Sequence, residues 1–310
     1  MKTKFHYIIA LFAFVLWGLT FPFGKMVLPP LSSYSFVFLR SLMGFSLLFV
    51  ILAIQKEIKP WLQSLKENFW PLFLFSLGPF ALSYTIQFYA IQYTTAINQS
   101  IIAQTSVIWV VLINFLVFKQ KPQLKFVLGV LTGIFGVVLI ITSSSASSST
   151  NTLKGDLLST IAFICWGSYT AFSKPLAVKI KPKYLTTSVL MFGGIFLSGI
   201  SIGTGLFDQV NQLTTLQWVV LLYLGFICTG LAYLLHMIGL SGPEVKSEYI
   251  AYFTLIMPII SASFSILFLD EQFSWRIGLG TFFVFLSVII IQYKRRKPLS
   301  QDDNASEFQL

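Results

Sequence analysis

Charged residues are scarce in this chain: Asp, Glu, Lys and Arg together account for 10% of its 310 residues. Soluble domains carry roughly 25% charged residues. So few charges cannot cover the surface of a water-soluble fold of this length, while apolar residues make up 55% of the chain. The composition therefore excludes a soluble globular protein and predicts an integral membrane protein that crosses the bilayer several times.

Acidic residues are the rarer of the two signs of charge, with 11 Asp and Glu against 21 Lys and Arg. An excess of positive charge is also typical of nucleic-acid-binding proteins. In this chain, however, the basic residues lie in short segments between apolar runs, where they set the orientation of a membrane protein. We therefore expect no nucleic-acid partner.

Cysteine and histidine are scarce as well, at two residues each. Cys165 and Cys228 lie inside apolar runs without CxxC spacing, so we expect two buried thiols and neither a disulfide nor a metal site. The chain also has no P-loop, no HExxH motif, no Asp-rich diphosphate motif and no paired membrane aspartates. These absences argue against an ATP site and against an intramembrane enzyme, and we expect no cofactor.

An internal repeat is the most informative feature that is present. Residues 13–25 recur as 162–174, at an offset of 149 residues, with Trp-Gly, Phe and Lys in the same register. The same offset pairs Tyr84 with Tyr233 and matches several glycines. Chance explains matched Leu or Phe in an apolar chain, but not matched Trp, Tyr, Lys and Gly together. We interpret the chain as one unit written twice.

Ten apolar runs are long enough for membrane spans, which need about 20 mostly apolar residues each. They predict an all-α integral membrane protein with ten transmembrane helices, arranged as two five-helix repeats. The first repeat covers 1–142 and the second 156–293; a flexible Ser-rich linker occupies 143–155, and a basic then acidic tail occupies 294–310. The predicted spans are 7–26, 35–54, 69–91, 95–118, 126–142, 156–174, 184–207, 216–239, 248–269 and 275–292.

The basic residues predict opposite orientations for the two repeats. In the first repeat they gather after the second and fourth spans, at 55–68 and 119–125. In the second repeat they gather after the sixth span, at 174–183, whereas 208–214 carries none. Placing these clusters in the cytoplasm puts both termini there and makes the two copies an inverted-topology repeat. Many transporters built in this way bind their substrate near the membrane midplane, at the repeat interface.

Three groups of residues carry a resemblance to a known family. They are 16–18 with 21–25 in the first span, 38–40 in the second, and 257–260 leading to 268–271 with Gly278. In order, spacing and duplication, the chain resembles the ten-helix EamA-type transporters of the drug/metabolite transporter superfamily over about residues 2–292. The resemblance implies a transporter of amino acids, nucleobase-like compounds or amphiphilic metabolites.

The chain departs from the pattern of this family in two places. Trp109 stands in the first repeat where the second has Pro258, and Lys121 stands where an acidic residue is expected. The small four-helix multidrug members of the superfamily couple transport to protons through a Glu in their first helix. Residues 14–17 contain no carboxylate, so this mechanism of coupling is not supported.

Polar residues inside the apolar runs are the candidates for substrate contact, because burying them in hydrocarbon is costly. Tyr84 and Gln87 share one face of the third span, and Tyr233 and His236 are their counterparts in the eighth. Two such faces would meet around a central cavity; the alternative is structural hydrogen bonding between helices. His236 is also a candidate for a proton relay, with an ordinary hydrogen-bonding role as the alternative.

The fourth and ninth spans add a second set of candidates. Asn98 and Gln104 belong to an amide-rich start of the fourth span, which suits a pore or a substrate that takes several hydrogen bonds. A structural role for each amide is the alternative. Tyr252 lies in the ninth span, and Glu248 at its start is the best carboxylate for a proton or ion role.

Aromatic and basic residues complete the set of candidates. Trp17 and Trp166 either stack on a substrate or pack in the interface between the repeats. Arg40 lies a few residues inside the second span, and we expect it to snorkel to the outer headgroups, with an anion contact as the alternative. We expect Lys25 and Lys174 to anchor equivalent helix ends at opposite membrane interfaces.

Three prolines lie inside predicted spans: Pro22, Pro79 and Pro258. Each removes a backbone donor and can kink its helix. They are candidate gate hinges, and static bends are the alternative.

Together these patterns predict a secondary transporter, an exporter of small neutral or zwitterionic metabolites, that works by alternating access of two inverted repeats. Few fixed charges in the predicted cavity disfavour phosphorylated substrates, which would need several Lys or Arg there. A passive facilitator or channel is the alternative, because no coupling carboxylate is evident. The expected partners are a small-molecule substrate, membrane lipids and, for coupled transport, protons or another ion. A monomer in the cell membrane is sufficient for this function.

Overall fold

The computed structural model describes residues 2–117, 119, 124–145, 150–245, 247, 250 and 252–292, and every element in these ranges is helical. The elements of the first half are α1 (Lys2–Trp17), α2 (Thr20–Val27), α3 (Ser33–Ile54), α4 (Ile58–Glu67), α5 (Phe69–Phe75), η1 (Ser76–Leu82), α6 (Ser83–Ala90), α7 (Ala96–Ile102), η2 (Ala103–Thr105), α8 (Ser106–Leu116) and α9 (Leu124–Ser145). Those of the second half are α10 (Thr150–Lys179), α11 (Pro182–Gly203), α12 (Leu206–Asn211), α13 (Thr215–Leu222), η3 (Tyr223–Leu231), α14 (Ala232–Ser241), η4 (Tyr252–Leu255), α16 (Ile256–Phe268) and α17 (Trp275–Gln292).

Six described segments are long and apolar enough to cross a membrane: Lys4–Val27, Ser33–Ile54, Phe69–Ala90, Ala96–Leu116, Pro182–Gly203 and Thr215–Ser241. Three shorter apolar helices accompany them, at Val127–Ile140, Phe253–Phe268 and Trp275–Ile290. Helix α10 is long enough to span a bilayer, but the Ser, Thr and Tyr residues along it make it more polar. The structure is an all-helical membrane fold with six clear spans.

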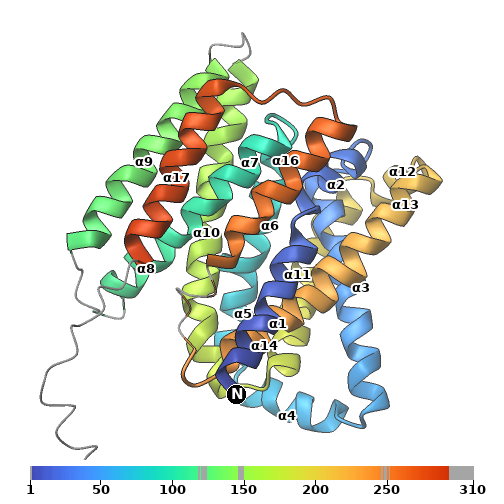
Figure 1. Cartoon of the computed structure of the whole chain (residues 1–310). Coiled ribbons are helices and arrows are strands. Elements are labelled where there is room, and N and C mark those ends of the chain that lie inside the picture. Colours follow the sequence, from blue (N-terminus) through green and yellow to red (C-terminus); the bar gives the residue numbers. More distant parts are fainter. Residues whose placement is uncertain are drawn as a thin grey trace, which may run out of the picture.

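Helix α10 lies inside the bundle and packs against α6, α8 and α14, so it joins elements of both halves of the chain (Figure 1). On one side α3 packs between α11 and η3. Helices α9 and α17 lie side by side at the opposite edge of the bundle (Figure 1). The largest group of buried apolar residues therefore lies among α1, α3, α6, α10, α11 and α14, away from the α9–α17 pair.

Irregular helical turns occur at equivalent positions of the two repeats. The π-helical segments η1 and η3 coincide at the 149-residue offset, and so do the 3-10 segments η2 and η4. Pro79 lies inside η1, whereas η3 contains no proline. A π-helical turn leaves backbone carbonyls without their usual partners and is often found at functional sites. The distortion belongs to the duplicated unit and does not depend on the proline.

The prolines of the first and ninth predicted spans lie just after a change in the backbone. Helix α1 ends at Trp17 and α2 begins at Thr20, so Pro22 falls in the first turn of α2. Pro258 likewise falls in the first turn of α16, after the 3-10 segment η4. A first turn tolerates proline because its N–H groups have no partner within the helix.

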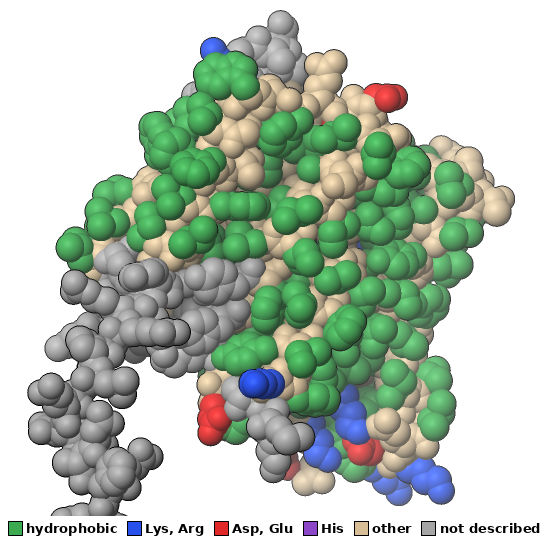
Figure 2. Space-filling model, viewed as in Figure 1, with side chains coloured by type: hydrophobic (Ala, Val, Ile, Leu, Met, Phe, Trp, Pro, Cys, Tyr) green, Lys and Arg blue, Asp and Glu red, His purple; other side chains and the backbone are tan. Residues whose placement is uncertain are grey.

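Helix α4 is an additional element that the spans did not predict. It lies across one end of the bundle, with Trp61 buried and donating from Nε1 to the Ser188 hydroxyl at 3.0 Å (Figure 1). Lys and Arg side chains gather at this end in Figure 2. Here Lys183 pairs with Glu57 at 2.7 Å, and the Tyr184 hydroxyl donates to the same carboxylate at 2.6 Å. The hydrogen bonds from Lys183 and then Tyr184 hold the pKa of Glu57 below its ordinary value.

The predicted Ser-rich linker at 143–155 is partly helical. Helix α9 continues to Ser145 and α10 begins at Thr150, so helix covers both ends of the range. The remaining residues, 146–149, lie outside the described part of the chain, and so does the predicted tail at 294–310.

Candidate functional site

A small cavity of about 30 Å³ lies in the middle of the bundle. Elements of both halves line it, from α1 and α2 through α6 and α8 to α10 and α16. Its lining residues are Phe14, Trp17, Thr20, Phe21, Tyr84, Gln87, Ala103, Ser106, Phe163, Trp166, Thr254 and Met257. A volume of this size holds one or two water molecules. The cavity is therefore too small for a metabolite, and its wall must move for one to enter.

The cavity wall is aromatic, and its rings come from symmetry-related positions. Trp17 and Trp166 contact each other edge to face, with ring centroids 5.6 Å apart. Tyr233 lies 5.1 Å from the Trp17 ring and 5.7 Å from the Tyr84 ring. Edge-to-face pairs of this kind add about 0.5–1.5 kcal/mol each beyond their buried area. The two copies of the repeated Trp-Gly segment thus meet at the centre of the molecule.

The lining has no charged side chain among the described residues. Its polar groups are the hydroxyls of Thr20, Ser106 and Thr254, the phenol of Tyr84 and the amide of Gln87. Trp17 uses its Nε1–H on the Cys228 carbonyl at 2.7 Å, so its indole is fixed in place. Such a wall suits an apolar body with a small number of hydrogen-bonding groups.

The predicted site residues divide into three groups. Trp17, Tyr84, Gln87 and Trp166 line the cavity. Tyr233 and His236 are completely buried behind that wall, with His236 5.3 Å from the Trp17 ring centroid. The last group is Asn98, Gln104, Tyr252 and Glu248. None of these lies among the described residues that line the cavity.

Asn98 and Gln104 make hydrogen bonds elsewhere. Asn98 donates from Nδ2 to the Asp156 carboxylate at 3.2 Å, and Gln104 donates from Nε2 to the Ser100 carbonyl at 3.0 Å. These contacts correspond to the structural alternative for each amide. Glu248 lies outside the described residues, and Tyr252 is described only as part of the backbone of η4.

Neither ring nitrogen of His236 has a hydrogen-bond partner among the described residues. Its ring instead packs against Phe14 at 5.6 Å and stacks on Trp166 at 6.3 Å between centroids. The described contacts therefore do not support an ordinary hydrogen-bonding role for His236. The ring lies directly behind the two tryptophans of the cavity wall.

The prediction that Arg40 snorkels to the headgroups is wrong. Its side chain is completely buried, in the interior of α3, and Nε donates to the Thr229 hydroxyl at 2.9 Å. The prediction assumed that α3 faces lipid at this position. Instead, Arg40 lies on the face of α3 that packs on η3, which leaves the guanidinium no path to the membrane surface.

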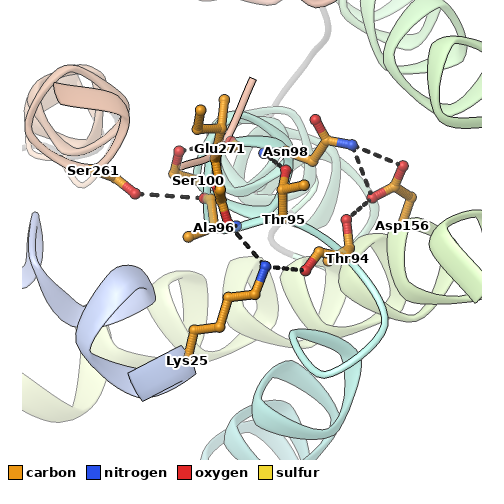
Figure 3. A network of polar contacts seen from close by, with 10 residues as sticks. Lys25, Thr94, Thr95, Ala96, Asn98, Ser100, Asp156, Ser261 and Glu271 are labelled. Atoms are coloured by element: carbon orange, nitrogen blue, oxygen red, sulfur yellow. Dashed lines mark hydrogen bonds and ion pairs between the residues drawn. The ribbon is translucent and has the colours of Figure 1, made fainter. Parts of the chain in front are cut away.

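A polar network joins several helices and loops around the start of α7 (Figure 3). We call Lys25, Thr94, Asp156, Glu271 and the start of α7 the α7-cap network. Lys25 donates from Nζ to Glu271 at 2.8 Å and to the Thr94 carbonyl at 3.2 Å. The Thr94 hydroxyl donates to Asp156. Helices α2 and α10 and the two loops before α7 and α17 are tied together here.

Glu271 also caps the N-terminus of α7. Its two carboxylate oxygens accept from the backbone N–H groups of Ala96 at 2.8 Å and Ile97 at 3.0 Å. The first N–H groups of a helix have no intrahelical partner and carry a partial positive charge, so a carboxylate there is stabilising. The acidic residue thus neutralises both a lysine and a helix end, and it is 5% exposed.

Lys174, the counterpart of Lys25 in the second repeat, makes a comparable contact. It donates from Nζ to the carbonyls of Leu240 at 2.8 Å and Gly242 at 2.6 Å. Lys25 reaches the backbone of the loop after α6, and Lys174 reaches the carbonyl of Gly242 in the equivalent segment after α14. Each lysine therefore links its helix to the backbone of a neighbouring interhelical segment. The predicted anchoring at a membrane interface stays a prediction.

Comparison with known proteins assigns the chain to a family. The pattern of the EamA-like transporter family matches residues 4–142 and again residues 153–293. The chain belongs to the EamA-like transporter family. This makes it a multi-pass membrane transporter of the drug/metabolite transporter superfamily and not an enzyme. The resemblance expected from the sequence is confirmed, and so is the duplication into two EamA domains.

Relatives of this EamA-like chain are similar along nearly their whole length. An uncharacterized transporter of Archaeoglobus fulgidus is 27% identical over 96% of this chain and 100% of its own. YoaV of Bacillus subtilis, also an uncharacterized transporter, is 24% identical over 91% of this chain and 96% of its own. A solved crystal structure of a protein matches with a TM-score of 0.68 at 15% identity, over 93% of this chain and 95% of the other. The last likeness shows the fold alone.

Sequence reasoning missed several residues of this EamA-like site. Phe14 and Phe163 line the cavity, and their identity in the repeat was a usable signal. Asp156 and Glu271 gave a different signal, because carboxylates beside apolar runs need partners. Met257 carried no signal, since an apolar residue in a span fits a lipid-facing position equally well.

Proposed function

We propose that this EamA-like chain is a secondary transporter that exports small neutral or zwitterionic metabolites. The observation that carries the proposal is the central cavity. Residues related by the repeat, above all Trp17 with Trp166 and Phe14 with Phe163, line it together. A site shared by two similar halves is what alternating access requires, because each half can release its side of the same site in turn.

The proposed architecture has ten membrane spans in two inverted five-helix repeats. The six clear spans, the three shorter apolar helices and the long helix α10 together account for ten. The paired positions of η1 with η3 and of η2 with η4 support a common unit in both halves. An odd number of spans in each unit inverts the second relative to the first.

The orientation of the proposed exporter is taken from the distribution of charge. The basic end of the molecule, around α4 in Figure 2, is the proposed cytoplasmic side, with both termini. The α7-cap network then closes the outer side of the cavity. A neutral or zwitterionic metabolite that accumulates in the cell would enter from the cytoplasmic end and leave when this network opens.

The chemistry of the wall supports small, largely apolar substrates. Six rings or indoles border the cavity region, and the described lining offers hydroxyls and one amide but no cation. A phosphorylated metabolite would bring two negative charges that this lining leaves unpaired. Amino acids, nucleobase-like compounds and amphiphilic metabolites fit better.

Counterflow in liposomes tests the proposal. The purified full chain is reconstituted, and a radiolabelled amino acid or nucleobase from a thermal-shift screen is added outside. Acceleration of uptake by the same unlabelled compound inside is expected of a carrier. Unsaturable, linear flux without such acceleration would instead establish a passive facilitator or channel, and no flux with any compound of the screen would refute transport of these classes.

A further inference from the structure

Arg40 is a buried cation without a carboxylate partner in the described chain. Its side chain is 0% exposed, and the two ion pairs found among the described residues, Lys25–Glu271 and Lys183–Glu57, do not include it. Neither of its Nη atoms has a protein hydrogen-bond partner there. A buried guanidinium is costly unless it is paired, and arginine does not lose its proton to escape that cost. Two strong donors thus remain unused in the interior.

The guanidinium is nevertheless held in a fixed position. Its Nε–H donates to the Thr229 hydroxyl oxygen at 2.9 Å, while the Thr229 hydroxyl donates to the Leu224 carbonyl at 2.8 Å. Its centre lies 5.2 Å from the Tyr84 ring centroid and 5.0 Å from that of Phe88. The ring faces attract the cation, and the Tyr84 hydroxyl also interacts with it, while neither Nη atom completes a hydrogen bond among the described residues. This arrangement orients the fork of the guanidinium and leaves the Nη side unused.

The backbone supports the same placement. Gly44 follows Arg40 by one turn of α3, and a Cβ there would lie 3.0 Å from the Gly230 nitrogen and 3.2 Å from the Thr229 carbonyl carbon. Helix α3 and the π-helical segment η3 are therefore in direct backbone contact at this level. The contact turns Arg40 toward the interior, and the π-helical turn presents Thr229 to it.

Two connections join Arg40 to the cavity wall. Tyr84 lines the cavity on one side and carries Arg40 against its ring on the other. Trp17, also in the wall, donates to the carbonyl of Cys228, the residue before Thr229. The guanidinium therefore lies behind the Tyr84 ring of the cavity wall. Because the cavity of about 30 Å³ is too small for a metabolite, wall residues must move when substrate enters, and Tyr84 is the wall residue whose ring contacts Arg40.

We propose that Arg40 binds the carboxylate of the substrate. This narrows the zwitterions of the proposed function to those with an apolar body and adds monocarboxylates of the same shape. The inference rests on the proposed transport function. A carboxylate accepts two parallel hydrogen bonds from a guanidinium, which matches the two unused Nη groups. The apolar body packs against Trp17 and Trp166 in the cavity wall. Tyr84 swings aside to connect the two parts of the site.

Matched carboxylate and amide probes test this proposal on the full chain in liposomes. The pairs are 3-phenylpropionate with 3-phenylpropanamide, and L-leucine with L-leucinamide. The wild type is expected to transport each carboxylate at least about tenfold more efficiently, by kcat/KM, than its amide. Arg40→Met should remove about ten- to hundred-fold of the carboxylate efficiency and leave the amides unchanged, as expected for one charge-assisted contact. Arg40→Lys should retain part of the preference, and the exposed Arg276→Met serves as the matched control.

Thermal stability separates binding from a structural role. Replacing a buried, unpaired charge by an apolar side chain of similar length is neutral or stabilising, so Arg40→Met should keep or raise the Tm measured without probe. A fall in Tm with equal loss for carboxylates and amides would overturn the proposal in favour of a structural arginine. Equal transport of both members of each pair by the wild type would overturn it without any variant.

The proposed function fails on a different result. If neither the probes nor any compound of the wider metabolite screen is transported, transport of this class is refuted together with the inference. Transport of neutral compounds alone refutes only the role of Arg40. Should Arg40→Met fail to fold, the preference of the wild type and its change in Arg40→Lys still decide.

Discussion

Replacing Glu271 by Gln should open the bundle at the α7-cap network, which is the proposed outer end. The carboxylate accepts from Lys25 Nζ at 2.8 Å, from Ala96 N at 2.8 Å and from Ile97 N at 3.0 Å. The amide of Gln keeps one acceptor oxygen, turns an NH₂ group toward a donor and removes the charge. Losing one to two charge-assisted contacts costs about 2–4 kcal/mol. If these contacts exist only in the closed form, the ratio of open to closed molecules rises about 30- to 900-fold.

The partner lysine should matter less. The Lys25 side chain is 36% exposed, so solvent screens its ion pair, and exposed pairs contribute about 0.2–1 kcal/mol. Lys25→Met should therefore shift the same ratio by only about 1.4- to 5-fold. Glu271→Gln should have the larger effect because Glu271 also caps the N-terminus of α7. That part of its interaction survives the loss of Lys25.

Labelling of a cysteine in the cavity wall measures this ratio. In a background with Cys165→Ala and Cys228→Ala, Thr20→Cys places a single thiol in the lining. A membrane-impermeant maleimide is applied to whole cells and, separately, to inside-out vesicles. Glu271→Gln should label much faster from outside than Lys25→Met, while labelling from inside should slow. Equal rates for Glu271→Gln and its parent would refute the gate; faster labelling only from inside would keep the gate and reverse the proposed orientation.

Three further predictions concern the centre of the bundle. Tyr84→Ala and Tyr233→Ala should each weaken the thermal-shift response to substrate with little loss of expression; unchanged responses in both would show that the central cavity is not the binding site. His236→Gln should leave liposome transport intact at pH 7, and a flattened pH dependence of transport in this variant would instead identify His236 as a proton carrier. Gly167→Ala should lower the Tm, because its Cβ would lie 2.5 Å from the Trp109 Cβ, and overpacking costs about 1–3 kcal/mol. Gly199→Ala, where nothing lies within 4 Å of the new atom, is the control that should not lower it.

The internal repeat was more informative about the structure than any single motif. It predicted that Trp17 and Trp166 are partners, and their rings meet at 5.6 Å in the cavity wall. It also predicted Tyr84 and Tyr233 as a pair, and these rings lie 5.7 Å apart. Symmetry-related residues near the axis of a duplicated fold are brought together by the duplication itself, so pairing them requires no knowledge of helix packing.

The sequence did not predict how each helix is rotated about its own axis. Phe14 is buried and Val15 is 39% exposed, yet both are apolar and both suit a membrane span. In a soluble protein polarity would separate the two faces of a helix, but lipid is as apolar as the protein interior. Arg40 shows the same limit for a polar residue: a position near the end of a span fits snorkelling, and only the contact of α3 with η3 turns the side chain inward.

The sequence by itself determined an all-helical membrane protein made of two similar halves, because apolar content, span length and internal repetition are local properties of the chain. It also indicated the family and the aromatic character of the centre. The tertiary structure alone decided that Asn98 pairs with Asp156 away from the cavity, that Glu271 caps a helix 174 residues before it in the chain, and that Arg40 lies behind Tyr84. These contacts join residues of distant segments. They depend on how each helix is rotated and placed against its neighbours, which no local pattern of residues specifies.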